Sequence, residues 1–326
     1  METTYRIHGG WRGSAGKRSS GTPLRRRMKL GSTRSMAALL LAIALPLGVH
    51  GQVTLRDDRG VTLVLPVPPR RIVSLLPSIT ESVCALNACS RLVGTDRFSN
   101  WPASVIALPK LGGIDDAQIE RIVALEPDVV LVSASARAVD RLEALGLKVL
   151  VLESRVSADV KRSLGLLATM LGTPVEAERV WAGIERDTRA AALRVPVSMR
   201  GKRVYFEVDP APYAAGAGSF IGETLARLGL ANAVPAELGA FPKLNPEYVV
   251  RLQPDIVMAN QRNLDEMPKR PGWGALRALK DRQSCTFASD HYELLTRPGP
   301  RMGEAAGVLA DCLAAIASAS SVSKPR

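Results

Sequence analysis

Histidine is scarce in this chain, and its scarcity limits the chemistry that the protein can perform. The sequence holds three histidines, His8, His50 and His291, and the first two lie in an N-terminal segment that we expect to be removed. A closed zinc site built from several histidine ligands is therefore excluded, and we predict no metal-ligating residues. A Ser-His-Asp hydrolase would have to use His291, and the Gly-x-Ser-x-Gly turn of many such enzymes is absent.

Two nucleotide-binding patterns are also missing. Neither Gly-x-Gly-x-x-Gly nor the P-loop pattern occurs in the sequence. Binding without catalysis becomes the leading class, and we predict no catalytic residues and no cofactor. The alternative is a hydrolase in which Asp290 and His291 act as acid and base. We expect these adjacent residues on a strand, where their side chains would point to opposite faces, which disfavours the alternative.

The positive charge of the chain is concentrated at its N-terminus. Residues 1–51 hold nine Lys and Arg against a single acidic residue, Glu2, and so account for most of the net charge of +12. A strongly basic protein raises the possibility of a nucleic-acid partner. Because the charge lies in a leader segment here, we predict no nucleic-acid binding.

The same segment has the pattern of a secretory signal peptide. Its basic residues end at Arg34, and the apolar run Met36–Val49 follows, which is shorter than the roughly 20 residues of a transmembrane helix. We expect cleavage near Gly51, with a start codon at either Met1 or Met28. No cysteine lies near the cleavage site, so a lipid anchor is not expected, and we predict a soluble periplasmic protein.

Four cysteines remain in the exported chain, and an oxidising compartment permits disulfides. Cys285, on a predicted strand, could meet Cys312 on the last predicted helix, but pairing cannot be deduced from sequence. Cys84 and Cys89 are five residues apart on a predicted helix, so their side chains should diverge. We therefore predict that these two are small buried apolar residues.

A short sequence pattern occurs twice, at Glu120 and again at Glu247. In each copy the Glu is followed five residues later by Leu, seven later by Pro and eight later by Asp, before an apolar run. The pattern predicts a short helix that stops before the proline and a turn into a buried strand. Acidic residues in a first helical turn have a simple explanation, since they interact favourably with the helix dipole.

Helices alternate with apolar strands along the rest of the chain, which predicts parallel sheets. The fold class expected is α/β, with two parallel-sheet lobes joined by a single long, rigid backbone helix. The helix is marked by apolar residues at Ala177, Val180 and Ile184. The expected parts are an N-terminal lobe at 52–172, the backbone helix at 173–197, a C-terminal lobe at 198–317 and a disordered tail at 318–326.

The segment Arg71–Glu81, followed by Leu92–Thr95, Leu111–Gly113 and the two copies of the repeat, resembles a known family. It is similar to periplasmic substrate-binding proteins of ABC importers, and most of all to the class with a helical backbone that serves cobalamin, haem and iron-siderophore uptake. The resemblance covers about residues 70 to 317. It implies two rigidly joined lobes with a shallow ligand cleft between them, in a protein that we expect to be a monomer.

The resemblance also implies a partner and a role for the repeated glutamates. In this family one acidic residue on each lobe engages arginines of the membrane permease dimer, and the matching positions are Glu120 and Glu247. Two exposed carboxylates on different lobes would provide a two-point, salt-sensitive contact.

By the same resemblance, loops that follow strands line the ligand cleft. Some of their aromatic residues could instead fill the lobe cores. The residues that we expect at the cleft are Pro77, Ser78, Phe98, Trp101, Gly112, Gly113, Tyr213, Phe220, Phe241, Asp290 and His291.

The identity of the ligand is inferred from the same loops. The segment Asp96–Pro102 is similar to that of cobalamin-binding members, and Ser289-Asp290 matches a contact position, although an aromatic of that family is replaced by His291. Siderophore-binding members often present several arginines, and few are available here. We therefore favour cobalamin or a related corrinoid over a ferric siderophore or haem.

Overall fold

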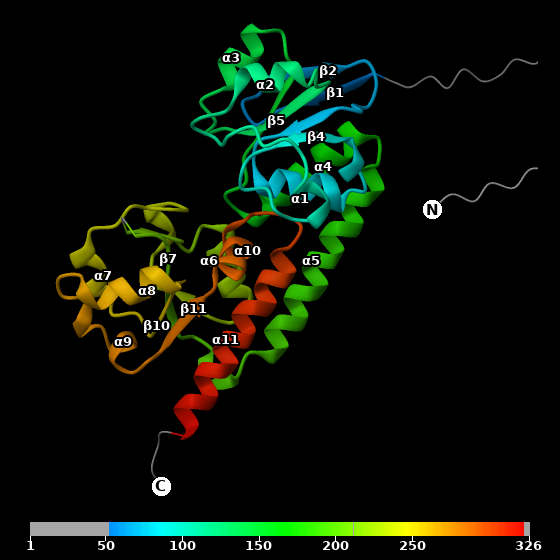
Figure 1. Ribbon diagram of the computed structural model, residues 1–326. Coiled ribbons are helices and arrows are strands. Elements are labelled where there is room, and N and C mark those ends of the chain that lie inside the picture. The colour runs from blue at the N-terminus through cyan, green and yellow to red at the C-terminus, as the bar shows by residue number, and fades with distance from the viewer. Residues whose placement is uncertain (1–51, 211, 323–326) are drawn as a thin grey trace, which may run out of the picture. The chain divides into compact units, whose positions relative to one another are not determined.

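The computed structural model describes residues 52–210 and 212–322 (Figure 1). The predicted leader, the start at Met28 and the cleavage near Gly51 lie outside the described residues.

The N-terminal lobe is built on a four-stranded, all-parallel sheet in the order β4-β3-β5-β6. Its central strands are apolar and buried on both faces, as parallel sheets require. An antiparallel hairpin, β1 and β2, precedes it. The strands are β1 (Val53–Arg56), β2 (Thr62–Leu65), β3 (Ile72–Ser74), β4 (Leu92–Thr95), β5 (Val129–Ser133) and β6 (Val149–Leu152).

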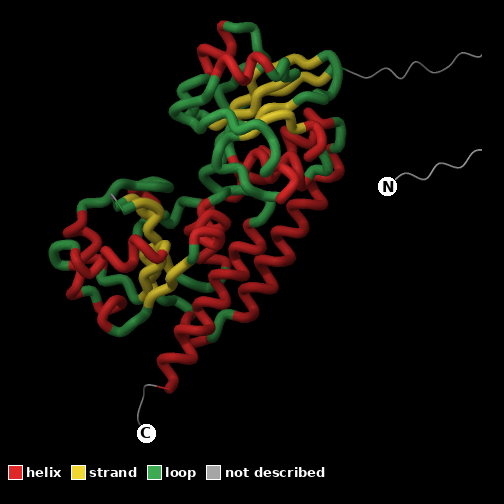
Figure 2. Tube along the Cα trace, viewed as in Figure 1, coloured by secondary structure: helices red, strands yellow, loops and turns green. Residues whose placement is uncertain are grey.

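Helices cover both faces of this sheet (Figures 1 and 2). Val130 and Val132 of β5 pack on one face with the short helices α2 and α3. Val129 and Leu131 pack on the other face with α1 and α4. The helices are α1 (Pro77–Ala85), α2 (Ile119–Ala124), α3 (Val139–Ala144) and α4 (Ser157–Leu171).

The C-terminal lobe repeats this plan. Strands β11, β10, β7 and β9 are parallel neighbours, and the short β8 pairs antiparallel with β7. The strands are β7 (Arg203–Asp209), β8 (Tyr213–Ala214), β9 (Ala231–Asn232), β10 (Ile256–Asn260) and β11 (Ser284–Phe287), and the helices are α6 (Phe220–Arg227), α7 (Pro246–Leu252), α8 (Gln261–Glu266), α9 (Arg277–Lys280) and α10 (Ser289–Thr296). Short 3₁₀ turns in the two lobes and between them are Cys89–Arg91, Ala103–Val105, Val197–Met199, Ala236–Leu238, Met267–Lys269 and Trp273–Ala275.

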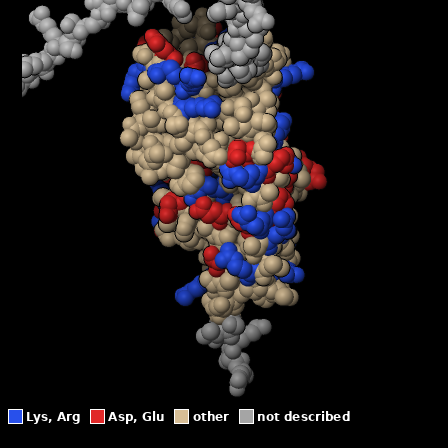
Figure 3. Space-filling model, turned by 90° about the vertical axis from the view of Figure 1, so that its right-hand side faces the viewer, with Lys and Arg blue, Asp and Glu red and all other residues tan. Residues whose placement is uncertain are grey.

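One long helix, α5 (Pro174–Arg194), connects the lobes, as predicted. A second long helix, α11 (Met302–Val322), packs along it (Figure 1). The predicted disordered tail therefore begins too early, because residues 318–322 continue α11. The apolar stripe of α5 is buried. Figure 3 views the molecule from the side where α5 lies in Figure 1, and it shows acidic and basic side chains intermixed on this face.

By length and composition alone, α11 could cross a membrane, since Met302–Ser320 has a mean hydropathy of 1.4. Its packing gives a different explanation. Ala306, Leu309 and Leu313 are buried in the core that includes α5, and Cys312 is bonded to Cys285 of β11. The apolar composition is that of a core helix.

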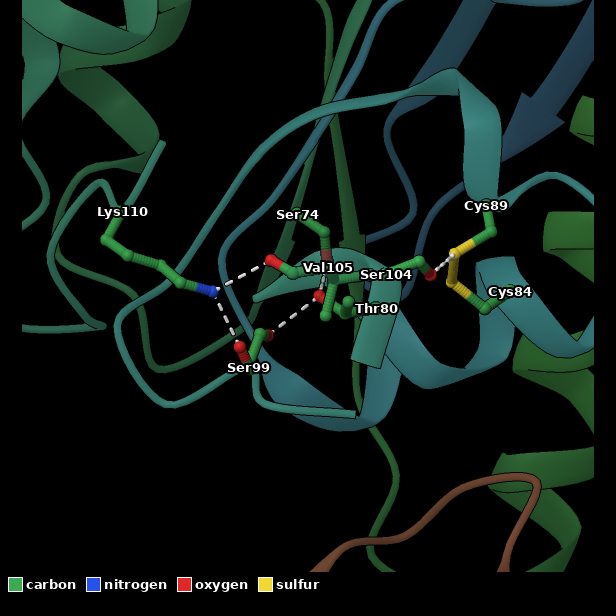
Figure 4. Close-up of a disulfide and its surroundings, with 8 residues drawn as sticks. All are labelled: Ser74, Thr80, Cys84, Cys89, Ser99, Ser104, Val105 and Lys110. Carbon is green, nitrogen blue, oxygen red and sulfur yellow. Dashed lines mark hydrogen bonds between the residues drawn. A yellow bond between two sulfur atoms is a disulfide. The ribbon is translucent and has the colours of Figure 1, made fainter. Parts of the chain in front are cut away.

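Both cysteine pairs form disulfides. The pairing of Cys285 with Cys312 that the sequence allowed is present, with 5.9 Å between the Cα atoms. The prediction for Cys84 and Cys89 is wrong, because these residues are also bonded to each other (Figure 4). The two do not share a helix: α1 ends at Ala85, and Asn87 adopts a positive φ of 63°, which turns the chain back.

The two copies of the repeated pattern have the same backbone. Helix α2 is followed by Glu126 and helix α7 by Gln253, with positive φ angles of 43° and 42°. Both residues immediately precede the proline of the repeat, which disfavours a helical conformation before it. The two helices therefore end in the same way, and after each of them the backbone enters a central strand of that lobe.

The repeated aspartate has a structural role in each lobe. Asp128 Oδ2 accepts hydrogen bonds of 2.7 and 2.8 Å from the backbone N–H groups of Arg70 and Arg71, just before β3. Asp255 Oδ2 accepts one of 2.9 Å from the N–H of Arg203, at the start of β7. In both lobes the carboxylate ties the beginning of a central strand to the beginning of its neighbour.

Candidate ligand-binding cleft

A cavity of about 270 Å³ lies between the lobes. In the N-terminal lobe its walls come from segments that follow strands β3, β5 and β6, so it lies at the carboxyl edge of the sheet, where open α/β sheets bind ligands. The C-terminal lobe contributes Phe241 and Pro298. The lining residues are Leu76, Ser78, Ile79, Ser82, Ser133, Ala134, Ser135, Leu152, Glu153, Ser154, Arg155, Val160, Ser163, Leu167, Phe241 and Pro298.

Serine hydroxyls dominate the polar part of this wall, with six serines among the lining residues. Ser133 and Ser135 share a hydrogen bond of 2.6 Å between their hydroxyls. The charged residues are Glu153 and Arg155, and Arg155 Nε donates to Glu153 Oε1 at 2.6 Å. The wall therefore combines apolar side chains with a polar part that is balanced in charge, and the polar part offers groups that both donate and accept hydrogen bonds.

Direct contacts hold the lobes together on two sides. The N–H of Phe220 donates to the carbonyl of Arg155 at 2.8 Å, and the N–H of Ser157 donates to Glu223 Oε2 at 2.7 Å. Elsewhere Arg297 of the C-terminal lobe forms a 2.8 Å ion pair with Glu81 of α1.

An aromatic loop, defined here as residues 98–101, follows β4 at the same sheet edge. Phe98 is 60% exposed and Trp101 38% exposed, unusual for side chains of this size. Arg97 lies over the ring of Phe98, and Arg301 lies 4.5 Å from the ring centroid of Trp101. The loop therefore presents two aromatic surfaces, each next to a guanidinium group.

The predicted glycines support this loop. Gly112 has a φ of +91°, and a Cβ atom there would lie 2.2 Å from the carbonyl oxygen of Asp116. Its own carbonyl accepts a 2.7 Å hydrogen bond from the N–H of Arg97. The N–H of Gly113 donates to Asp116 Oδ1 at 2.9 Å, and the same carboxylate pairs with Arg97. Only glycine fits at position 112 without strain.

Buried polar groups fix the loop to the N-terminal lobe (Figure 4). Ser99 Oγ lies within hydrogen-bond distance of Thr80 Oγ1, at 2.9 Å, and of the Asp96 carboxyl. Lys110 Nζ donates to the carbonyl of Ser99 at 2.6 Å and to that of Val105 at 3.1 Å. Burial raises the pKa of the Asp96 carboxyl, against the hydrogen bond from Ser99, and burial lowers the pKa of Lys110.

The raised pKa of Asp96 gives a pH dependence of stability. Between the ordinary carboxyl pKa of 3.8 and the raised value, the folded protein holds a proton that the unfolded chain has lost. The contribution of Asp96 to the free energy of unfolding should therefore fall as pH rises through this interval and level off above it. Urea unfolding of the wild type and of Asp96→Asn can be measured at closely spaced pH values. As pH rises through the interval, the free energy of unfolding of the wild type should fall relative to that of the variant. A constant difference across the series would contradict the assignment.

The predicted cleft residues divide into groups. Ser78 and Phe241 line the cavity, and Pro77 begins α1 beside Ser78. Phe98, Trp101, Gly112 and Gly113 belong to the aromatic loop and its support. Phe220 is 4% exposed and packs on Phe241 with 5.8 Å between ring centroids, so it fills the core instead of facing the cleft.

Tyr213, Asp290 and His291 lie apart from the cavity. Tyr213 is 38% exposed, with Lys243 above its ring. Asp290 and His291 occupy the first turn of α10, so the expectation of a strand is wrong. The N–H of His291 donates to Asp290 Oδ1 at 2.8 Å, a local contact of the helix terminus instead of an imidazole–carboxylate pair.

The C-terminal lobe has a hollow of about 740 Å³ at the ends of β10 and β11. Its acidic residues, Asp265, Glu266 and Glu293, outnumber its single basic residue, Arg262. Across residues 52–210 and 212–322, no group of three His, Cys, Asp or Glu side chains could hold a metal ion.

Most residues of the cavity wall were not predicted from the sequence. Ser133 ends the apolar strand β5 and Ser135 follows it closely, while Ser154 and Arg155 come shortly after the apolar strand β6. Their position after predicted strands was the signal that could have found them.

The repeated glutamates lie outside both hollows. Glu120 is in the first turn of α2, 80% exposed, with Arg141 Nη2 2.9 Å from its Oε1. Glu247 is in the first turn of α7, and its N–H is capped by Asn245 Oδ1 at 2.8 Å. Each lobe therefore carries one of them in an equivalent position.

A family model described as periplasmic binding protein matches residues 72–290. The chain belongs to this family. An uncharacterised ABC transporter substrate-binding lipoprotein of Bacillus subtilis (strain 168) is 29% identical over 272 residues, covering 80% of this chain and 85% of that protein. The vitamin B12-binding protein of Vibrio parahaemolyticus serotype O3:K6 is 23% identical over 242 residues, covering 72% of this chain and 86% of that protein.

Solved structures of the family share the fold. The apo form of the periplasmic heme-binding protein from Roseiflexus sp. RS-1 superposes with a TM-score of 0.64 at 26% identity, covering 76% of this chain and 99% of that chain. The predicted family and the two-lobed α/β fold are thus confirmed. The Bacillus subtilis relative is named as a substrate-binding component of an ABC transporter.

Proposed function

We propose that the exported protein captures cobalamin or a related corrinoid in the periplasm and delivers it to the permease of an ABC importer. The observation that carries this proposal is the serine-rich, charge-balanced cavity between the lobes, close along the same sheet edge to an exposed aromatic loop. A vitamin B12-binding relative supports the ligand class.

The cavity chemistry favours a corrinoid because of the substituents on this macrocycle. A corrin ring carries neutral amide side chains, each of which donates and accepts hydrogen bonds. Serine hydroxyls such as those of Ser78, Ser135 and Ser154 match both functions. With about 270 Å³, the cavity is smaller than the roughly 300–1,000 Å³ of typical ligand pockets, so it would hold one edge of the ring.

Haem and ferric siderophores are the alternatives, since heme-binding proteins are among the structural neighbours. Haem has two propionates, and many siderophore complexes are anionic. A site for either ligand would be expected to offer cationic side chains that are not already paired with a carboxylate. Arg155 in the cavity is paired with Glu153, and Arg97 beside the aromatic loop is paired with Asp116.

Delivery would use Glu120 and Glu247 as the contacts with permease arginines. Both are exposed, they occupy equivalent places on the two lobes, and neither lines a hollow at the cleft. The relatives that are named as ABC transporter components support a permease partner.

Calorimetric titration of the mature protein with cyanocobalamin, cobinamide, haemin and a ferric hydroxamate siderophore tests the ligand class. We expect one corrinoid to bind per chain, with weaker or no binding of the two anionic ligands. Tight siderophore or haemin binding without any corrinoid binding would refute it. A hydrolase would instead show esterase or phosphatase turnover that His291→Ala abolishes.

A further inference from the structure

Arg297 makes an unusual number of contacts between the lobes. It follows α10 in the C-terminal lobe, and its side chain is 10% exposed. Nη1 donates to Glu81 Oε1 and to Asn100 Oδ1, both at 2.8 Å. Nη2 donates to the carbonyl of Phe98 at 3.1 Å and to Glu293 Oε2 at 2.6 Å. Three of these four acceptors belong to the N-terminal lobe.

Two of those acceptors are in the aromatic loop. Arg297 binds the loop through a backbone carbonyl and a side-chain amide, and Asn100 Nδ2 returns a 2.8 Å hydrogen bond to Glu293 of the C-terminal lobe. Four residues later along the chain, Arg301 covers the ring of Trp101 and donates two 2.8 Å hydrogen bonds to Glu304. The linker between α10 and α11 therefore contacts Phe98, Asn100 and Trp101 of the loop.

The third acceptor, Glu81, explains why the contact persists. Its side chain is 1% exposed, and burial raises the pKa of its carboxyl while the hydrogen bond from Arg297 opposes that rise. A buried carboxylate that loses its cationic partner lowers the stability of the fold, so the ion pair with Glu81 favours keeping the Arg297 side chain at this position. The planar guanidinium can reach all four acceptors together, which the single ammonium of lysine cannot.

Ser99 and Lys110 fix the loop to its own lobe, and Arg297 fixes it to the other. We propose that Arg297 is a positioning residue for ligand binding, which holds Phe98 and Trp101 in place against the C-terminal lobe. Arg297 itself acts through the loop and need not touch the ligand. The effect on affinity rests on the proposed function, whereas the effect on the loop does not.

Hydrogen exchange of the ligand-free protein tests the effect on the loop. In Arg297→Met we expect the amides of residues 96–106 to exchange at least tenfold faster than in the wild type, because the loop loses one of its two anchors. Arg297→Lys should give an intermediate increase in exchange rate. Because this variant keeps a positive charge beside Glu81, it also serves as the test if the methionine variant folds poorly. The matched control is Arg270→Met, which removes a buried arginine from Glu207 within the C-terminal lobe. Unchanged exchange in both Arg297 variants, or equal acceleration in the control, would overturn the proposal.

A double-mutant cycle tests the effect on binding, with cyanocobalamin as the probe. Arg297→Met should weaken binding about 10- to 100-fold in the wild type but by less than about threefold in a Phe98→Ala background, because there the positioned ring is already lost. Equal losses in both backgrounds would indicate a general structural role and refute positioning. If cyanocobalamin does not bind to the wild type, the proposed ligand fails, and the exchange result still decides the role of Arg297.

Discussion

Uptake of ligand into permease-containing vesicles is expected to fall to background in the double variant Glu120→Lys plus Glu247→Lys. Each reversal would place a lysine opposite a permease arginine, and like charges at an interface cost several kcal/mol. Ligand affinity should not change, because neither glutamate lines the cleft. Each single variant should lose less than the double variant, and the loss should shrink as salt rises.

Simple stabilisation of the helices gives a different result. If Glu120 and Glu247 act only on the helix dipole, each substitution costs about 0.3–1 kcal/mol of stability and leaves transport by the folded protein intact. Asp140→Lys plus Asp281→Lys is a matched control, since it reverses one exposed acidic residue on each lobe. Normal uptake by the glutamate double variant, or equal loss in the control, would contradict the docking role.

Ligand binding itself should be lost when the cavity is filled. Ser154 lines the wall immediately after β6, and Ser154→Trp would place a large ring in a space of about 270 Å³. We expect affinity to fall at least about 100-fold, equivalent to about 2.7 kcal/mol. Calorimetry on the folded variant measures this loss.

Two variants separate the volume of the new side chain from other effects. Ser154→Ala removes the hydroxyl without filling the space and should cost about tenfold or less. Ser198→Trp adds the same ring at an exposed position outside the cavity wall and should bind normally. Normal affinity in a folded Ser154→Trp would show that the ligand binds elsewhere.

Local elements of the fold could be predicted closely from sequence. Helix α5 (Pro174–Arg194) lies within the predicted range of 173–197, because its apolar residues recur at helical spacing. The repeat of Glu, Leu, Pro and Asp also predicted a short helix, a turn and a buried strand, and each lobe contains one such unit. These patterns depend on residues that are near one another in the chain.

Features that depend on distant segments could not be predicted in the same way. The cavity wall combines loops after three strands, and the pair Glu81–Arg297 joins residues 216 positions apart. Phe220 and Phe241 both follow strands, yet only Phe241 lines the cavity, a difference decided by packing. The disulfide Cys84–Cys89 was missed because one left-handed residue, Asn87, ends the helical geometry on which the prediction relied.

Native mass spectrometry of the mature protein with an equimolar mixture of cyanocobalamin, cobinamide, haemin and a ferric hydroxamate siderophore tests the central claim most directly. The protein is predicted to retain one corrinoid per chain in preference to the other two classes. Retention of haemin or the siderophore, with no corrinoid bound at any concentration, would contradict it.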